Sequence, residues 1–163
     1  MVTRQTIVII GTGSVGRAIA TSLAGGNFNM LLCDEEFSKS EALAKELRDT
    51  VQNCNAEAMR CSFDCAWEAD IIVLALSMEE QKKVAAYIKD VVTQKILVSI
   101  VQGIQQVASG ISFSSCHCEA LQELLPNTKL VNIVFNHCIT TEQVFVTGDD
   151  LESVDVVLDM LQS

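Results

Sequence analysis

The feature that most constrains this chain is a glycine-rich segment between an apolar run and a helix-like run. Residues 6–10 read Thr-Ile-Val-Ile-Ile, and the segment Gly11-Thr12-Gly13-Ser14-Val15-Gly16 follows at once. The glycines have the G-x-G-x-x-G spacing, and Asp34 ends a second apolar run about 20 residues further on. A strand, this spacing, a helix and then an acid are together typical of a dinucleotide-binding βαβ unit.

Each glycine has an expected part in such a unit. Gly11 permits the tight turn, Gly13 lets the backbone approach a pyrophosphate, and Gly16 lets the helix pack closely on the strand. The free N–H groups at the helix start and the helix dipole favour the phosphates. We therefore take all of residues 11–16 as candidate cofactor-binding residues. The alternative is a glycine turn that only packs a helix on a sheet.

Strand-like and helix-like runs alternate along the rest of the chain. The expected strands are 6–10, 28–33, 57–61, 70–76, 95–101, 129–135 and 143–147. The expected helices are 14–25, 38–51, 79–90, 115–125 and 151–162, with a single turn at 66–69. Ser38, with Glu41 three residues on, is the expected N-cap of the second helix.

This alternation predicts the α/β class. We expect a three-layer Rossmann fold, with a mostly parallel, doubly wound sheet and helices on both faces. The 163 residues fit a single dinucleotide-binding domain, 1–163, without a separate substrate domain. Ligands of such sheets bind beyond the carboxyl ends of the strands. The residues expected at that edge are 11–16, Asp34, 76–78, 102–103 and 136–137.

Composition excludes several classes of function. The net charge of −10 disfavours nucleic acid and anionic membrane surfaces, because both need a basic patch. No apolar run reaches about 18 residues, so no membrane span is expected. The chain enters its first strand almost at once, and we therefore expect a cytoplasmic protein without a signal peptide. The seven cysteines include no CxxC pair, and Cys116-His117-Cys118 lacks a second ligand pair, so no metal site is predicted.

Asp34 carries the prediction of the cofactor. An acid at the tip of the second strand accepts hydrogen bonds from ribose hydroxyls and repels a 2′-phosphate, which an Arg usually pairs. The segment Cys33-Asp34-Glu35-Glu36 holds no Arg, and Lys39 is the only cation expected nearby. The sequence therefore predicts NAD(H) over NADP(H). The alternative is a solvated, acidic start of the second helix.

The second half of the chain resembles a known family in two segments. Residues 121–137 read LQELLPNTKLVNIVFNH, which is similar to the helix, LLP turn and following strand of the deazaflavin (coenzyme F-420)-dependent NADP oxidoreductases. Residues 144–150, VFVTGDD, resemble the next strand of that family. Pyrroline-5-carboxylate reductases and the reductase domains of membrane ferric reductases share the same N-terminal domain. The resemblance covers essentially the whole chain.

The resemblance implies further roles. The loop 11–16 would hold the pyrophosphate, Leu76 and Ser77 would lie near the nicotinamide ribose, and Phe135 and Asn136 would line the nicotinamide pocket. Relatives read NADP through a Ser/Thr and Arg group after the second strand, where this chain has Cys33-Asp34-Glu35. They also continue into further helices, which help to shape the substrate site and often a homodimer.

Two classes of function remain open on the sequence. The first is an oxidoreductase that transfers hydride between a nicotinamide cofactor and a small, unidentified substrate, with little acid–base equipment of its own. His137 is then the candidate proton donor, since its pKa suits neutral pH, and Asn136 the candidate partner of a carboxamide or carbonyl. The second is a cofactor-binding module or sensor without turnover.

Overall fold

The computed structural model describes residues 3–102, 105–107, 110–112, 115–138 and 141–162. Of the described residues within 102–117 and 135–143, and of residue 145, only the backbone is described. The strands are β1 (Gln5–Ile10), β2 (Phe28–Cys33), β3 (Asn55–Met59), β4 (Ile71–Leu74), β5 (Ile96–Gln102), β6 (Gln105–Val107), β7 (Gly110–Ser112), β8 (Lys129–Cys138) and β9 (Thr141–Gly148). The helices are α1 (Ser14–Leu23), α2 (Phe37–Thr50), α3 (Ser62–Glu68), α4 (Met78–Ile88), the 3₁₀ turn η1 (Lys89–Val91), α5 (Ser115–Leu124) and α6 (Leu151–Gln162).

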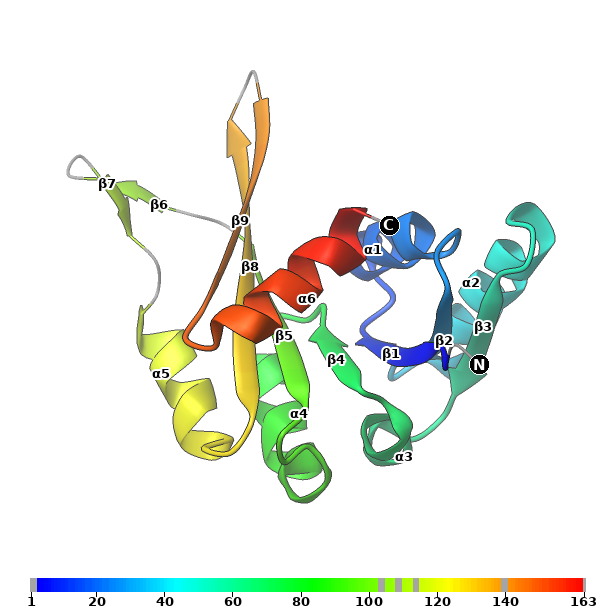
Figure 1. Ribbon diagram of the computed structural model, residues 1–163, viewed down its shortest axis with the longest axis horizontal. Coiled ribbons are helices and arrows are strands. Elements are labelled where there is room, and N and C mark those ends of the chain that lie inside the picture. Colours follow the sequence, from blue (N-terminus) through cyan, green and yellow to red (C-terminus); the bar gives the residue numbers. More distant parts are fainter. Residues whose placement is uncertain (1–2, 103–104, 108–109, 113–114, 139–140, 163) are drawn as a thin grey trace.

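A seven-stranded sheet runs through the molecule in the order β3-β2-β1-β4-β5-β8-β9 (Figure 1). All neighbouring pairs are parallel except β8 and β9, which are antiparallel. The strand order reverses direction between β1 and β4, which is where doubly wound sheets bind their ligands. The α/β class and the mostly parallel, doubly wound sheet are thereby confirmed.

Helices cover both faces of this sheet. One apolar cluster packs α1, α2 and α6 against one face, and includes Ile19, Leu43 and Val157. The second cluster packs α3, α4 and α5 against the other face, and includes Cys65, Ile88 and Leu121. The near-continuous apolar strands supply side chains to both clusters, because successive residues of a strand point to opposite faces. The result is the expected three-layer arrangement.

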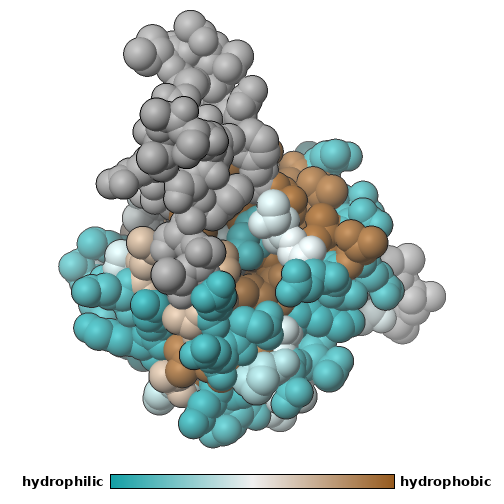
Figure 2. Space-filling model, turned by 90° about the vertical axis from the view of Figure 1, so that its left-hand side faces the viewer, coloured by the Kyte–Doolittle hydropathy of each residue, from teal (hydrophilic) through white to brown (hydrophobic). Residues whose placement is uncertain are grey.

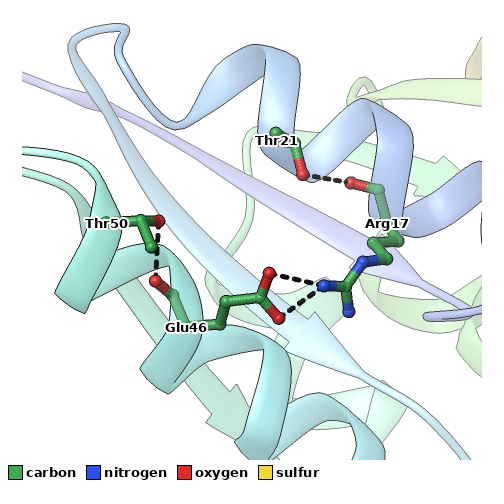
Figure 3. A network of polar contacts seen from close by, with 4 residues as sticks. All are labelled: Arg17, Thr21, Glu46 and Thr50. Atoms are coloured by element: carbon green, nitrogen blue, oxygen red, sulfur yellow. Dashed lines mark hydrogen bonds and ion pairs between the residues drawn. The ribbon is translucent and has the colours of Figure 1, made fainter.

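Two polar contacts connect α1 with α2 on the outside of the first layer. The guanidinium of Arg17 donates to both carboxylate oxygens of Glu46 (Figure 3). Within each helix, a threonine hydroxyl donates to a carbonyl one turn earlier, from Thr21 to Arg17 and from Thr50 to Glu46. Both members of the ion pair are about half exposed, so the pair contributes little to stability.

Hydrophilic residues cover much of the described surface on the side of α5, and a band of hydrophobic residues is exposed at the upper right of this view (Figure 2). None of the helices in the described ranges is both long and apolar enough to cross a bilayer.

Several predicted boundaries are wrong. The single turn at 66–69 is the end of the longer helix α3, whose Cys65 and Ala66 are buried against the sheet. The strand expected at 57–61 lies two residues earlier, as β3, because its pairing with β2 ends at Met59. The hairpin of β6 and β7 was not predicted. Both β8 and β9 are longer than expected and form a second hairpin that projects beyond the sheet (Figure 1).

The predicted cap of α2 is also wrong. Its N-cap is Glu36, without a side-chain cap, and Ser38 lies inside the first turn. Asp34 Oδ1 accepts the Glu36 N–H at 3.0 Å, which orders the backbone just before the helix. The helix begins at Phe37, one residue before Ser38, so the Ser38 hydroxyl cannot act as its N-cap.

Candidate functional site

A cleft of about 1080 Å³ opens at the carboxyl edge of the sheet, where the strand order reverses between β1 and β4. Its walls come from the loop after β1, the ends of β2 and β3, and the start of α4. The cleft is lined by Ile10, Gly11, Gly13, Ser14, Val15, Cys33, Asp34, Glu35, Glu36, Lys39, Arg60, Ser62, Ala75, Leu76, Ser77, Met78, Glu80, Lys83, Val84 and Ile100.

Two of the three glycines are required by the fold itself. Gly11 has a φ of +102°, which L-residues rarely adopt, and a Cβ there would lie 2.4 Å from the Ala75 carbonyl oxygen. A Cβ on Gly16 would lie 1.8 Å from the Gly11 carbonyl oxygen. These two positions fit the interpretation of a glycine turn that packs a helix on a sheet as well as they fit ligand binding.

Gly13 is different, because nothing in the described protein requires a glycine there. A Cβ built on Gly13 meets no described atom within 4 Å, and its φ of −70° and ψ of −166° suit any residue. Gly13 lines the cleft, so the space in front of it is open to a ligand. A glycine at this position therefore suits the close approach of a bound ligand to the backbone, and not the packing of another part of the protein against it.

The start of α1 faces this space with positive polarity. Its N-cap is Gly13, which has no side chain to accept from the first N–H groups, and its first turn contains no acid. Such a helix end binds anions, because free N–H groups and the helix dipole act together. Ser14 and Val15 also line the cleft, whereas Thr12 and Gly16, which were expected there too, are not among its lining residues.

Asp34 fastens the glycine loop to the end of β2. Its Oδ2 accepts from the Thr12 N–H at 2.8 Å and from the Thr12 hydroxyl at 2.7 Å, and its Oδ1 accepts from Glu36. Burial acts to raise the pKa of the Asp34 carboxyl, but these hydrogen bonds outweigh burial and hold the pKa below its usual value. The carboxylate is therefore charged, and it keeps accepting capacity toward the cleft.

Leu76 and Ser77 lie opposite the glycine loop, after β4. The Ser77 hydroxyl accepts from the Glu80 N–H at 3.3 Å, and the Glu80 carboxylate accepts from the Ser77 N–H at 3.2 Å. This capping box begins α4 and could have been found from the Ser-x-x-Glu spacing. The structure thus brings the predicted residues Gly11, Gly13–Val15, Asp34, Leu76 and Ser77 into one cleft.

The predicted nicotinamide-side residues lie at the end of β8. Phe135 pairs with Gln102, the last residue of β5, and Asn136 and His137 continue the strand beyond that pair. The side chains of Phe135, Asn136 and His137 are outside the described part of the chain, as are those of Cys116 and His117. Among the described side chains, no group of three or more His, Cys, Asp or Glu could hold a metal ion.

The sequence analysis missed Arg60. Met59 is in register with Cys33, so Arg60 and Asp34 are the next residues along two neighbouring strands, and both line the cleft. The expectation that Lys39 is the only nearby cation is therefore wrong. Arg60 was missed because the strand predicted at 57–61 placed it inside the sheet rather than after its edge. Lys83 of α4 also lines the cleft.

A family model described as "NADP oxidoreductase coenzyme F420-dependent" matches residues 6–103, which is more than half of the chain. The chain belongs to this family. This membership confirms the resemblance, drawn from the sequence, to a family of NADP oxidoreductases. The matched residues include the glycine loop, Asp34 and the start of α4.

Known proteins resemble this member of the family over most of its length. An F420-dependent NADP reductase of Methanocaldococcus jannaschii is 25% identical over 171 residues, covering 94% of this chain and 76% of the relative. A pyrroline-5-carboxylate reductase from Coxiella burnetii superimposes with a TM-score of 0.74 at 15% identity, covering 98% of this chain and 56% of that one.

The pyrroline carboxylate reductase of Plasmodium falciparum, solved with NADP bound, gives a TM-score of 0.66 at 18% identity and covers 96% of this chain and 54% of that one. The chain spans little more than half the length of these two reductases. At such identities the likeness concerns the fold, and it confirms the Rossmann architecture.

Proposed function

We propose that residues 1–163 form a single dinucleotide-binding domain, which takes part in hydride transfer between a nicotinamide cofactor and a small acceptor. The observation that carries this proposal is the open space in front of Gly13, beside the uncapped start of α1. A glycine without a packing reason, at a helix end that favours anions, suits a pyrophosphate. Membership in a family of NADP oxidoreductases supports the same assignment.

The residues present fit such a cofactor. The N–H groups of Ser14 and Val15 would bind the pyrophosphate, and Asp34 would accept from the adenosine ribose. Leu76 and Ser77 would contact the nicotinamide ribose, with Phe135 and Asn136 at the nicotinamide. When bound, the cofactor supplies the hydride chemistry. The chain binds it, orients it and excludes water, and His137 is the proposed proton donor.

We keep NAD(H) as the preferred cofactor in this proposal, although the family is described by NADP. Asp34, Glu35 and Glu36 all line the cleft at the end of β2, and Lys39 already pairs with Glu36 at 3.4 Å. A 2′-phosphate at this position would meet three carboxylates, and the single charge of Arg60, which lies beside Asp34, would offset only part of that repulsion.

The test is to replace Gly13 by Val. Because a Cβ there meets no described atom within 4 Å, the variant should fold, with a loss of stability of about 1 kcal/mol from the poorer N-cap, and yet lose NADH and NADPH binding by at least about tenfold. Gly25→Ala is the matched control, since a Cβ on Gly25 also meets nothing within 4 Å and Gly25 does not line the cleft. Isothermal titration with both cofactors measures the affinities.

Two results would contradict the proposal. If neither cofactor binds the wild-type chain, the assignment of the cleft fails. If Gly13→Val binds both as tightly as the wild type, the pyrophosphate lies elsewhere. Tighter binding of NADP(H) than of NAD(H) by the wild type would contradict only the cofactor preference.

The alternative from the sequence is a cofactor-binding module without turnover. The chain's coverage of 56% and 54% of the two pyrroline carboxylate reductases keeps this candidate open. A panel of ketone, imine, flavin, deazaflavin and ferric acceptors, with NADH and NADPH, separates the two candidates. Tight cofactor binding without oxidation by any acceptor favours the module. A cytoplasmic location and a homodimer also stay predictions.

A further inference from the structure

Arg60 occupies a position in the cleft to which nothing above assigns a role. It is the first residue after β3, and β3 is the neighbour of β2 at the edge of the sheet. The register pair of Cys33 with Met59 puts Arg60 beside Asp34, at the far end of the cleft from β4. If Asp34 holds the adenosine ribose, as proposed above, the group next to Arg60 is the base attached to that ribose.

The guanidinium of Arg60 has an aromatic partner on one side. Its Cζ lies 3.9 Å from the centroid of the Phe37 ring, at the first residue of α2. Phe37 is half-buried and is not among the cleft-lining residues, whereas Arg60 is exposed and lines the cleft. The ring therefore lies behind the guanidinium, and the other side of Arg60 is directed toward the cleft.

We propose that Arg60, supported by the Phe37 ring, is the platform on which the adenine base of the cofactor stacks. When one face of a planar guanidinium rests on an aromatic ring, its other face is available for stacking. A neutral aromatic base can stack on that face. This proposal rests on the proposed function, because it uses the cofactor assigned there. It makes Arg60 a positioning residue and not a catalytic one.

Charge decides between a base and a phosphate as the partner of Arg60. The carboxylates of Asp34, Glu35 and Glu36 line the same end of the cleft, and Lys39 is paired with Glu36. A phosphate next to Arg60 would lie among these acids, whereas adenine is neutral and pays no such repulsion. Among the described side chains, the Arg60 guanidinium forms no ion pair with a carboxylate, and its contact with the Phe37 ring leaves a face for stacking.

The experiment compares Arg60→Lys with Arg60→Gln. Lysine keeps the charge and loses the plane, while glutamine loses the charge. Isothermal titration of each protein uses four probes: NADH, ADP-ribose, 2′-phospho-ADP-ribose and nicotinamide mononucleotide. We expect both variants to bind NADH and both ADP-ribose probes on the order of tenfold more weakly, with nicotinamide mononucleotide unchanged.

Arg17→Lys is the matched control, because Arg17 lies outside the cleft and is paired with Glu46. Phe37→Leu should weaken the same three adenine-containing probes, since it removes the ring behind the guanidinium. Circular dichroism and urea unfolding show that each variant is folded.

Three results overturn the inference. Unchanged binding of ADP-ribose by both Arg60 variants means that adenine lies elsewhere. A loss confined to 2′-phospho-ADP-ribose and to Arg60→Gln makes Arg60 a reader of the 2′-phosphate. If the wild-type chain binds neither NADH nor ADP-ribose, the proposed function itself fails. If the wild type binds both and the Arg60 variants bind them equally well, only the role of Arg60 fails.

Discussion

At the scale of single residues, Asp34 has two roles that the sequence presents as one. An acid at this position is expected to accept from a ribose. The same carboxylate also holds the glycine loop through Thr12 and fixes the start of α2 through Glu36. A substitution of Asp34 therefore changes the free protein as well as its ligand binding, and the two effects have to be measured separately.

Asp34→Asn should lower the free energy of unfolding by about 1–2 kcal/mol at pH 7. An amide offers only one accepting oxygen, so it cannot accept from Thr12 and Glu36 together, and its NH₂ would face a donor. Urea unfolding measures the loss. Glu35→Gln is the control, because it removes a neighbouring charge whose carboxylate makes no hydrogen bond to the described residues, and it should change stability by less than about 0.5 kcal/mol.

The pH dependence has a definite sign. The pKa of Asp34 is lowered in the folded chain, so the unfolded chain takes up this proton first as the pH falls. The stability that Asp34 contributes is complete above its ordinary pKa of about 3.9 and is lost as the pH falls through the folded value. The difference in the free energy of unfolding between wild type and Asp34→Asn should therefore be constant from about pH 6 to about pH 8 and shrink below about pH 4. A constant difference down to about pH 3 would contradict this account.

At the scale of elements, the starts of α2 and α4 show how the same sequence signal can succeed or fail. Both helices carry a serine followed three residues later by glutamate, at Ser38 and Ser77. Only Ser77 forms the capping box, because Ser77 is the N-cap of α4, whereas α2 begins at Phe37 and Ser38 lies inside its first turn. The spacing therefore predicts a cap only where the helix begins just after the serine.

Ser77→Ala should lower the free energy of unfolding by about 1 kcal/mol, because it removes the cap of α4. Ser38→Ala is its matched control and should leave stability within about 0.5 kcal/mol of the wild type, since Ser38 caps nothing. Equilibrium unfolding in urea compares the two variants. Equal losses in both would mean that the α2 cap predicted from the sequence is present in solution.

At the scale of the whole molecule, β8 and β9 form an arm that extends past the carboxyl edge of the sheet (Figure 1). The pairing of β8 with β5 ends at Phe135, while β8 itself continues to Cys138 alongside β9. The proposed nicotinamide-side residues Asn136 and His137 are on this arm, whereas the glycine loop is three strands away. Cofactor binding would therefore join distant parts of the chain.

Asn136→Ala should weaken NADH binding more than ADP-ribose binding, because the proposed contact is to the nicotinamide half. The loss of one hydrogen bond predicts a change of about 5- to 10-fold in the ratio of the two dissociation constants. Gln143→Ala, on the strand position paired with Asn136, is the control for damage to the arm. Equal weakening of both probes by Asn136→Ala would remove this residue from the nicotinamide side.

The sequence by itself determined the class of fold, the glycine loop and the acid at the tip of β2. These depend on short-range patterns: buried parallel strands are continuously apolar, and a tight turn needs glycine at fixed spacing. The range of α6 also followed from such patterns, and family membership agrees with the predicted class of fold.

Only the tertiary structure decided which side chains share the cleft and which strands lie beside one another. Arg60 and Asp34 are far apart in sequence, and both line the cleft because β2 and β3 end in register. An error of two residues in the predicted bounds of β3 is enough to conceal this proximity. The Thr12–Asp34 hydrogen bonds and the open space before Gly13 are likewise properties of packed neighbours. Hydrophobic periodicity fixes which residues are buried, but it carries no information about which strand lies beside which.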